Sequence, residues 1–208
     1  MNIFYLSKNW KQAAGMHCDK HCVKMLVEYA QLMSTAHRVI DGTEYYAKTK
    51  NDRKIKRWLH PDPKLELELY KASHVNHPSN IWVRENKEHY TWLFLMFNEL
   101  SKEYTKRYSK KTLIKNFGGE FKVHKTWEKL GKILEIAPKN IKDNGWVDPP
   151  QCMPDHCKDD DVVKAYRNYY IQEKSSFAKW NYSGTPKWFK EEIIMSTNTC
   201  TSTIEQGI

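Results

Sequence analysis

The chain has 208 residues and carries 34 Lys and Arg against 25 Asp and Glu, so its formal net charge at pH 7 is +9. Hydrophobic residues make up 40% of it, which is enough to bury a core in one domain. No stretch approaches the ~18 apolar residues of a membrane span. The first residues, MNIFYLSKNWK, lack the long apolar run of a secretory signal. We therefore expect neither a membrane protein nor a secreted one.

The basic excess indicates a polyanionic partner, most often nucleic acid. Many of the aromatic residues stand beside Lys or Arg, a pattern that suits stacking on bases as well as core packing. The alternative is a basic protein without such a partner, because the lysines are spread along the whole chain. Five cysteines without a secretory signal are typical of reduced thiols, so we expect a cytoplasmic protein.

The first half of the chain predicts two long helices separated by a polar segment. A helical stripe over 16–40 ends at Asp41-Gly42, and its apolar members are Val23, Leu26, Val27, Ala30, Met33 and Ala36. Residues 43–64 are polar and basic, so we expect a loop that holds one short helix at most. A short helix is expected over 64–73. Pro78 then opens a second long helix, 79–108.

The second half predicts long loops and one further long helix. Residues 109–121 are basic and end in a turn, FGGE, and a short helix follows that stops near Pro138. The prolines at 149, 150 and 154 exclude a helix through the next segment. Three aspartates at 159–161 suit the start of a third long helix, 161–180. We expect one all-α domain over 1–190 with three main helices, and a disordered Ser/Thr-rich tail over 191–208.

The stretch HCDKHCVKM, residues 17–25, begins a line of polar side chains along the first helix. Its members follow steps of three or four residues, so they share one face: His17, His21, Lys24, Glu28, Gln31 and Thr35. One interpretation is a solvent-facing side with a Lys24–Glu28 ion pair. The other is the lining of a cleft, because histidine, glutamine and threonine are less typical of a solvated face than Lys and Glu.

Two metal sites are alternatives for the same stretch. His17 and His21 have the i, i+4 spacing of two ligands on one helix face, and a third could come from His37, His74, His77 or His156. The other set is Cys18, Cys22, Cys152 and Cys157. Neither has the close ligand spacing of the usual zinc site. We therefore predict no cofactor, and a metal at His17 and His21 stays an alternative.

Three stretches together resemble a known family. They are AGMHCDKHCVKMLVEYAQLMSTAHRVIDG, NHPSNIWVRENKEHYTWLFLMFNELSKEYTKRY and AKWNYSGTPKWF, about half of the chain. Their order is similar to that of the pyrimidine-dimer DNA glycosylases of phages and bacteria, the endonuclease V type. The chain is also similar to phage proteins of unassigned activity that share HCDKH and PPQ-MP. The resemblance implies a small, basic, all-α DNA glycosylase whose first long helix lines the DNA cleft, in the host cytosol if phage-encoded.

The chain departs from the family's catalytic pattern at two positions. In the family the amine freed by removal of Met attacks the sugar, but Asn2 follows Met1 here, so Met1 is expected to stay. Lys24 stands where the family's helical glutamate is expected. A lysine amine can also form a Schiff base with a sugar carbon. We therefore assign Lys24 as candidate nucleophile and Glu28 as candidate acid and base, flanked by His17 and His21. The alternative for the pair is a helix salt bridge worth ~0.3–0.5 kcal/mol.

DNA contacts are predicted at three further places. At the start of the second long helix, free backbone N–H groups and polar side chains could hold a phosphate, although a capping turn is the alternative. A proline-stiffened loop could insert a side chain between bases or simply pack. The last helix and its sequel suit backbone contact and stacking. The residues are His77, Asn80 and Arg84; Trp146 and Gln151; and Arg167, Lys187 and Trp188.

The predicted function is base excision on DNA by a glycosylase, with or without AP-lyase activity, acting on a damaged or modified base. Such an enzyme flips its target out of the stack before cutting the bond. Two alternatives belong to other classes. One is a metal-dependent enzyme on nucleotides built on His17 and His21, and the other is a non-catalytic DNA-binding protein.

Overall fold

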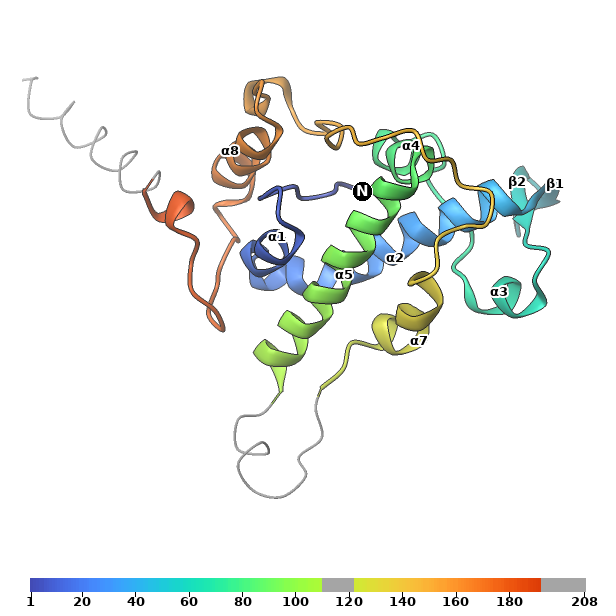
Figure 1. Ribbon diagram of the computed structural model, residues 1–208, viewed down its shortest axis with the longest axis horizontal. Helices are drawn as coiled ribbons and strands as arrows, with labels where there is room; N and C mark the ends of the chain where they lie inside the picture. The colour runs from blue at the N-terminus through green and yellow to red at the C-terminus, as the bar shows by residue number, and fades with distance from the viewer. Residues whose placement is uncertain (110–121, 192–208) are drawn as a thin grey trace, which may run out of the picture.

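The structure, a computed structural model, describes residues 1–109 and 122–191 (Figure 1). In chain order its elements are α1 (Trp10–Met16), α2 (Asp19–Asp41), β1 (Thr43–Lys48), β2 (Lys54–Leu59), α3 (Pro63–Glu68), α4 (Pro78–Glu85), α5 (Lys87–Tyr108), α7 (Lys125–Leu134), the 3₁₀ turn η1 (Asp155–Cys157) and α8 (Val162–Lys174). A helical turn over 187–191 follows. Within the described residues no helix has both the length and the apolar character that crossing a bilayer requires.

The prediction of an all-α fold is wrong, because a β-hairpin occupies the segment expected as a loop. β1 pairs antiparallel with β2, from Thr43 opposite Leu59 to Lys48 opposite Lys54. β1 is mostly exposed and β2 mixes exposed with half-buried residues, so neither strand has the buried apolar face that identifies a strand from sequence. Cross-strand side chains stabilise the pair instead. A Lys56–Glu44 ion pair spans 2.9 Å, and the Lys54 ammonium lies 3.8 Å from the centre of the Tyr46 ring.

The first predicted long helix, 16–40, is present as α2 but begins only at Asp19, after α1, and the second, 79–108, is broken into α4 and α5. The chain is extended at His17 and Cys18, between α1 and α2, and again at Asn86, between α4 and α5. Asn86 starts α5 by accepting a hydrogen bond from the Glu88 amide at 2.9 Å. The apolar stripe continues across both breaks, so periodicity alone does not reveal them. The third helix, α8, ends at Lys174, and the tail predicted over 191–208 lies outside the described residues except for its first one.

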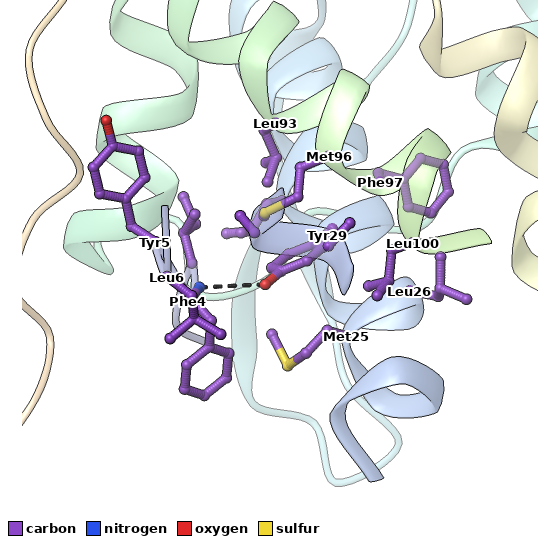
Figure 2. Packing of buried hydrophobic residues seen from close by; sticks show 14 of the residues in the cluster. Phe4, Tyr5, Leu6, Met25, Leu26, Tyr29, Leu93, Met96, Phe97 and Leu100 are labelled. Atoms are coloured by element: carbon purple, nitrogen blue, oxygen red, sulfur yellow. Dashed lines mark hydrogen bonds between the residues drawn. The ribbon is translucent and has the colours of Figure 1, made fainter. Parts of the chain in front are cut away.

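The core forms around α2 and α5, and the first six residues of the chain are part of it (Figure 2). Ile3, Phe4, Tyr5 and Leu6 are extended and buried, and we call residues 1–6 the N-terminal arm. The Phe4 amide donates a hydrogen bond to the Tyr29 hydroxyl of α2 at 3.2 Å. Other anchors come from far along the chain. They are Asn2 to the Cys152 carbonyl, Tyr5 to Asp148, and Arg167 to the Leu6 carbonyl.

A buried arginine of α5 holds the start of α2. The Arg107 side chain is fully buried and donates to the carbonyls of His17 at 2.8 Å and Gly15 at 3.0 Å. It also reaches the Asp19 carboxylate at 3.4 Å. The other oxygen of that carboxylate accepts from the Asn181 amide at 2.7 Å. The junction between α1 and α2 is therefore tied to α5 and to the C-terminal segment by one charged network.

A second buried arginine holds the other end of α2. Arg38 is 3% exposed and donates to four main-chain carbonyls and to the Glu66 carboxylate. The carbonyls belong to Trp58 in β2, Glu66 in α3, and Leu69 and Tyr70 after it. These bonds fix the hairpin and α3 against α2. A guanidinium group suits this place because its donors point in several fixed directions.

We expect Arg38→Lys to lower the free energy of unfolding by ~3 kcal/mol, because one ammonium cannot replace a fork of donors and leaves buried carbonyls unpaired. Denaturant titration followed by circular dichroism measures this change. The matched control is Arg53→Lys, on the exposed turn of the hairpin. If both variants unfold at the same denaturant concentration, Arg38 does not hold this part of the fold.

Candidate functional site

The polar line of α2 divides into a buried part and a surface part. His17 is fully buried and His21 is 6% exposed. Glu28 keeps 16% of its side chain exposed, and Lys24 keeps 70%. The four side chains therefore do not line one cleft together. The two histidines lie in the core behind the N-terminal arm, and only Lys24 and Glu28 can meet a ligand from solvent.

Both histidines are hydrogen-bonded inside the core. The two ring nitrogens of His17 contact the Ala13 carbonyl at 2.7 Å and the Tyr29 hydroxyl at 2.8 Å. Nδ1 of His21 contacts the Tyr170 hydroxyl of α8, and its ring stacks on Phe4 with centroids 4.4 Å apart. With both nitrogens of His17 already partnered, His17 has no free lone pair to offer a metal.

Burial keeps both of these histidines neutral. Desolvation lowers the pKa of His17 to about 4, and the Arg107 charge acts in the same direction. Desolvation, followed by the nearby charges of His17, Lys24 and Lys174, lowers the pKa of His21 to about 3. Their chemistry in the folded protein is thus that of neutral hydrogen-bonding groups.

The surface part centres on Glu28, where α2 meets the start of α4. Lys24 Nζ lies 3.2 Å from Glu28 Oε1. His77 precedes α4, and its Nδ1 accepts the Ser79 amide at 3.2 Å, so a neutral His77 carries its proton on Nε2. Desolvation lowers the pKa of His77, and the Met1 amine adds to this effect while Glu28 opposes it. The Met1 amine and the Glu28 carboxylate thus both act on the pKa of His77.

Cations and aromatic rings gather near His21, at the start of α2. The Lys20 ammonium lies 5.0 Å from the centre of the Phe177 ring, and that of Lys174 lies 4.3 Å from the centre of Tyr169. Lys24 and Lys174 both act on the pKa of His21, which places them on the same side of the molecule. We define the basic-aromatic surface as Lys20, Lys24, Tyr169, Lys174 and Phe177. Ammonium groups beside aromatic faces are the combination that holds a nucleic-acid backbone and its bases.

The sequence predicts Lys24 as a site residue and assigns the last helix, which carries Tyr169 and Lys174, to backbone contact and stacking, but it does not single out Lys20. Lys20 stands one turn before Lys24, so the spacing of 4 that identified the polar line also carries this signal. Tyr169, Lys174 and Phe177 lie on α8 and just after it. Their contact with α2 joins segments about 150 residues apart, which no local pattern in the sequence reveals.

Several predicted DNA contacts are engaged inside the protein instead. Asn80 is fully buried and donates to the carbonyls of Ser73 and His74. The Arg84 guanidinium donates to the Val75 carbonyl at 2.6 Å, and the Gln151 side chain bonds the backbone of Asp159. These residues shape the loops beside the site.

The remaining predicted contacts lie at or near the surface. Trp146 is 39% exposed, and its indole N–H donates to Asp148 at 2.9 Å. Arg167 donates to the N-terminal arm and lies 5.5 Å from the centre of the half-buried Trp188 ring. Lys187 is exposed. Among the predicted DNA-binding residues, His77 is the one on whose pKa the Glu28 charge acts.

Two groups among the described residues offer three metal-ligating atoms within 4.8 Å of one another. One is His156, Cys157 and Glu173, in which His156 Nε2 already contacts the Glu173 carboxylate at 2.8 Å. The other is His37, Asp41 and His60, at the far end of α2. Neither group includes His17 or His21. Cys18, Cys22, Cys152 and Cys157 are all free thiols.

We expect the protein to lose stability as the pH falls from about 6.5 towards 4. In that window the unfolded histidines bind protons, whereas folded His17 and His21 do so only near pH 4 and 3. The two histidines therefore cost no stability above about pH 6.5. At lower pH, each unit of difference between the unfolded and folded pKa of a histidine lowers the free energy of unfolding by up to ~1.4 kcal/mol. Denaturant titrations at several pH values measure the slope. His21→Gln should flatten it and His156→Gln, at an exposed position, should not; an unchanged slope in His21→Gln contradicts the assignment.

No protein-family model matches the chain, and no curated protein or solved structure matches it either. The similarity to pyrimidine-dimer DNA glycosylases is thus neither supported nor opposed by these comparisons.

Proposed function

We propose that the protein binds DNA through the basic-aromatic surface and excises a damaged or modified base at Glu28. The observation that carries this proposal is the position of the Glu28 carboxylate. It is mostly buried, it pairs with the Lys24 amine of the basic-aromatic surface at 3.2 Å, and its charge acts on the pKa of His77. The net charge of +9 favours the same partner.

Each group near Glu28 has a role in glycosidic bond cleavage. As the bond breaks, its electrons leave with the base and positive charge develops on C1′ of the sugar. The Glu28 carboxylate stabilises this charge. His77 carries a proton on Nε2 and is the candidate donor to the departing base, a transfer worth ~10²–10⁴-fold in rate. In this reaction His17 and His21 are not catalytic; they hold α2 against the N-terminal arm and α8.

A lyase reaction additionally requires an amine that attacks C1′. In its unprotonated form it bonds to C1′, the ring oxygen takes a proton as the sugar ring opens, and a Schiff base results. The Lys24 amine contacts Glu28 directly. In a chain that begins at Met1, the Met1 amine is the other candidate, because it acts on His77 together with Glu28. The carboxylate can take the proton that either amine releases.

A non-catalytic DNA-binding protein would use the same surface without needing Glu28. The mostly buried carboxylate favours catalysis, since a surface that only binds phosphates gains nothing from a negative charge paired with one of its lysines. The metal-dependent alternative finds no support at His17, because both of its ring nitrogens are hydrogen-bonded in the core.

Charge should dominate DNA binding. We expect affinity for duplex DNA to fall steeply as the salt concentration rises. The combined Lys20→Ala and Lys174→Ala changes should reduce the slope of log K against log salt by ~1.8, because each lost phosphate contact accounts for ~0.9 of that slope. Fluorescence anisotropy at several salt concentrations measures this slope. Lys102→Ala removes an exposed lysine of α5 and serves as the control. If the double variant has the same slope as the unaltered protein, DNA does not bind at the basic-aromatic surface.

Excision should depend on Glu28. We expect Glu28→Gln to slow base release from damaged DNA by ~100-fold without weakening DNA binding, because it removes the charge and keeps the shape. Glu99→Gln is a matched control, since Glu99 pairs with Lys102 on α5 at similar exposure, 19% against 16%. Gel assays on oligonucleotides that carry a panel of lesions measure release. If no lesion is excised, DNA binding alone is the function.

The amine can be identified by borohydride trapping on abasic-site DNA. We expect one covalent adduct, lost either in Lys24→Ala or after acetylation of the Met1 amine, because reduction traps the Schiff base on the amine that formed it. Lys102→Ala must retain the adduct. An adduct that survives both changes shows that neither amine near Glu28 attacks the sugar.

A further inference from the structure

A cavity of about 580 Å³ lies at the far end of α2, between the β2–α3 connection and α7 with the segment after it. Its volume is within the range of small-molecule sites. His37 and Asp41 of α2 and His60 after β2 line it, with apolar side chains and three lysines around them. His37 follows Glu28 by nine residues, ~14 Å along the helix and on its opposite face, so this cavity is separate from the site at Glu28.

A hydrogen-bond relay fixes the tautomer of His37. The Tyr90 hydroxyl donates to the Leu134 carbonyl at 3.0 Å, so it accepts from His37 Nε2–H at 2.9 Å. Nδ1 of His37 is therefore a free acceptor. Desolvation lowers the pKa of His37 to about 4, which keeps the ring neutral. This nitrogen is buried and has no hydrogen-bond partner among the described residues.

A backbone amide fixes the opposite tautomer in His60. The Asp62 N–H donates to His60 Nδ1 at 3.1 Å, so a neutral His60 carries its proton on Nε2. This Nε2–H is also buried without a partner in the described part of the chain. His37 and His60 are 3% and 6% exposed. A buried polar group without a partner destabilises the fold, so two of them favour a ligand that pairs with both.

Asp41 adds a second acceptor to this group. Its carboxylate is oriented by the amides of Lys139 at 2.7 Å and Asn140 at 2.9 Å, and by the Asn140 side chain. These three bonds leave one oxygen, Oδ2, with lone-pair capacity. The ligating atoms of Asp41, His37 and His60 lie within 4.8 Å of one another.

A metal ion is not the ligand that this group favours. A histidine that binds a metal offers a lone pair and carries its proton on the other nitrogen. His37 meets this condition, but His60 carries its proton on the unpartnered nitrogen and would have to give up the Asp62 amide. Three lysines line the same cavity, Lys64, Lys132 and Lys139, and they disfavour a cation and favour an anion.

We propose that this cavity binds a guanine nucleotide. One donor, His60 Nε2–H, and two acceptors, His37 Nδ1 and the Asp41 carboxylate, match the guanine edge, which presents one acceptor, O6, and two donors, N1–H and N2–H. Adenine, cytosine and thymine edges do not offer this set. Leu65, Ile133 and Ile136 supply apolar contact for the ring, and the three lysines supply charge for the phosphate. The guanine belongs either to a free mononucleotide or to a base turned out of DNA.

Isothermal titration calorimetry with dGMP, dAMP, dCMP and TMP tests the proposal. We expect dGMP to bind at least tenfold more tightly than the other three. Asp41→Asn should weaken dGMP at least tenfold, and His37→Phe likewise. Lys139→Ala should weaken dGMP but not deoxyguanosine, whereas Lys71→Ala, at an exposed lysine outside the lining, should change neither. Thermal unfolding of each variant shows whether it is folded.

Competition identifies the source of the guanine. A free nucleotide as natural ligand predicts that an oligonucleotide with one unpaired guanine does not displace dGMP, and a turned-out base predicts that it does. Glu28→Gln must leave dGMP binding unchanged, so failure here and failure of the proposed excision are distinguishable. The proposal is overturned if the four nucleotides bind equally or not at all, or if folded Asp41→Asn binds dGMP as the unaltered protein does. Tight binding of Zn²⁺ that His60→Gln abolishes, with no dGMP binding, also overturns it.

Discussion

Buried guanidinium groups hold both ends of α2 to main-chain carbonyls, and the other elements are arranged around the helix that they fix. Arg107 ties its start to α1, and Asp19 links the same network to the C-terminal segment. Arg38 ties its end to the hairpin and α3. A buried guanidinium without these carbonyls would be strongly destabilising, so each network forms as a unit or not at all. The surface at Glu28 and the cavity at His37 lie on opposite faces of one rigid element.

The motif HCDKH shows what a local sequence pattern can predict about a site and what it cannot. Helical spacing puts His17 and His21 on one helix face, but the chain is extended at His17, and the roles of both depend on partners that spacing cannot reveal. Tyr170, the partner of His21, lies 149 residues away, and Arg107 stabilises the break between α1 and α2 from 90 residues away. Periodicity reports which face of a helix is buried. It does not report whether a buried polar residue is a ligand or part of the core.

The part of the candidate site that lies on one helix was predictable from the sequence. The part that forms when distant segments pack together was not. The Lys24–Glu28 pair follows from an i, i+4 spacing and is present. Asn80 and Gln151 are residue types that often contact nucleic acid. Loops without regular hydrogen bonds also need such side chains, because they satisfy the backbone carbonyls of the loop itself. The hairpin escaped prediction for a related reason. Its strands are stabilised by cross-strand contacts between polar side chains and not by a buried face.

The N-terminal arm has a consequence for the order of folding. The arm is synthesised before its partners Asp148, Cys152 and Arg167, which follow some 140 to 160 residues later. Until then Ile3, Phe4 and Leu6 have no finished surface to bury against, and such long loops close slowly. During translation the nascent chain therefore exposes an apolar segment that a chaperone can recognise. Docking of the arm is then among the last steps that complete the core.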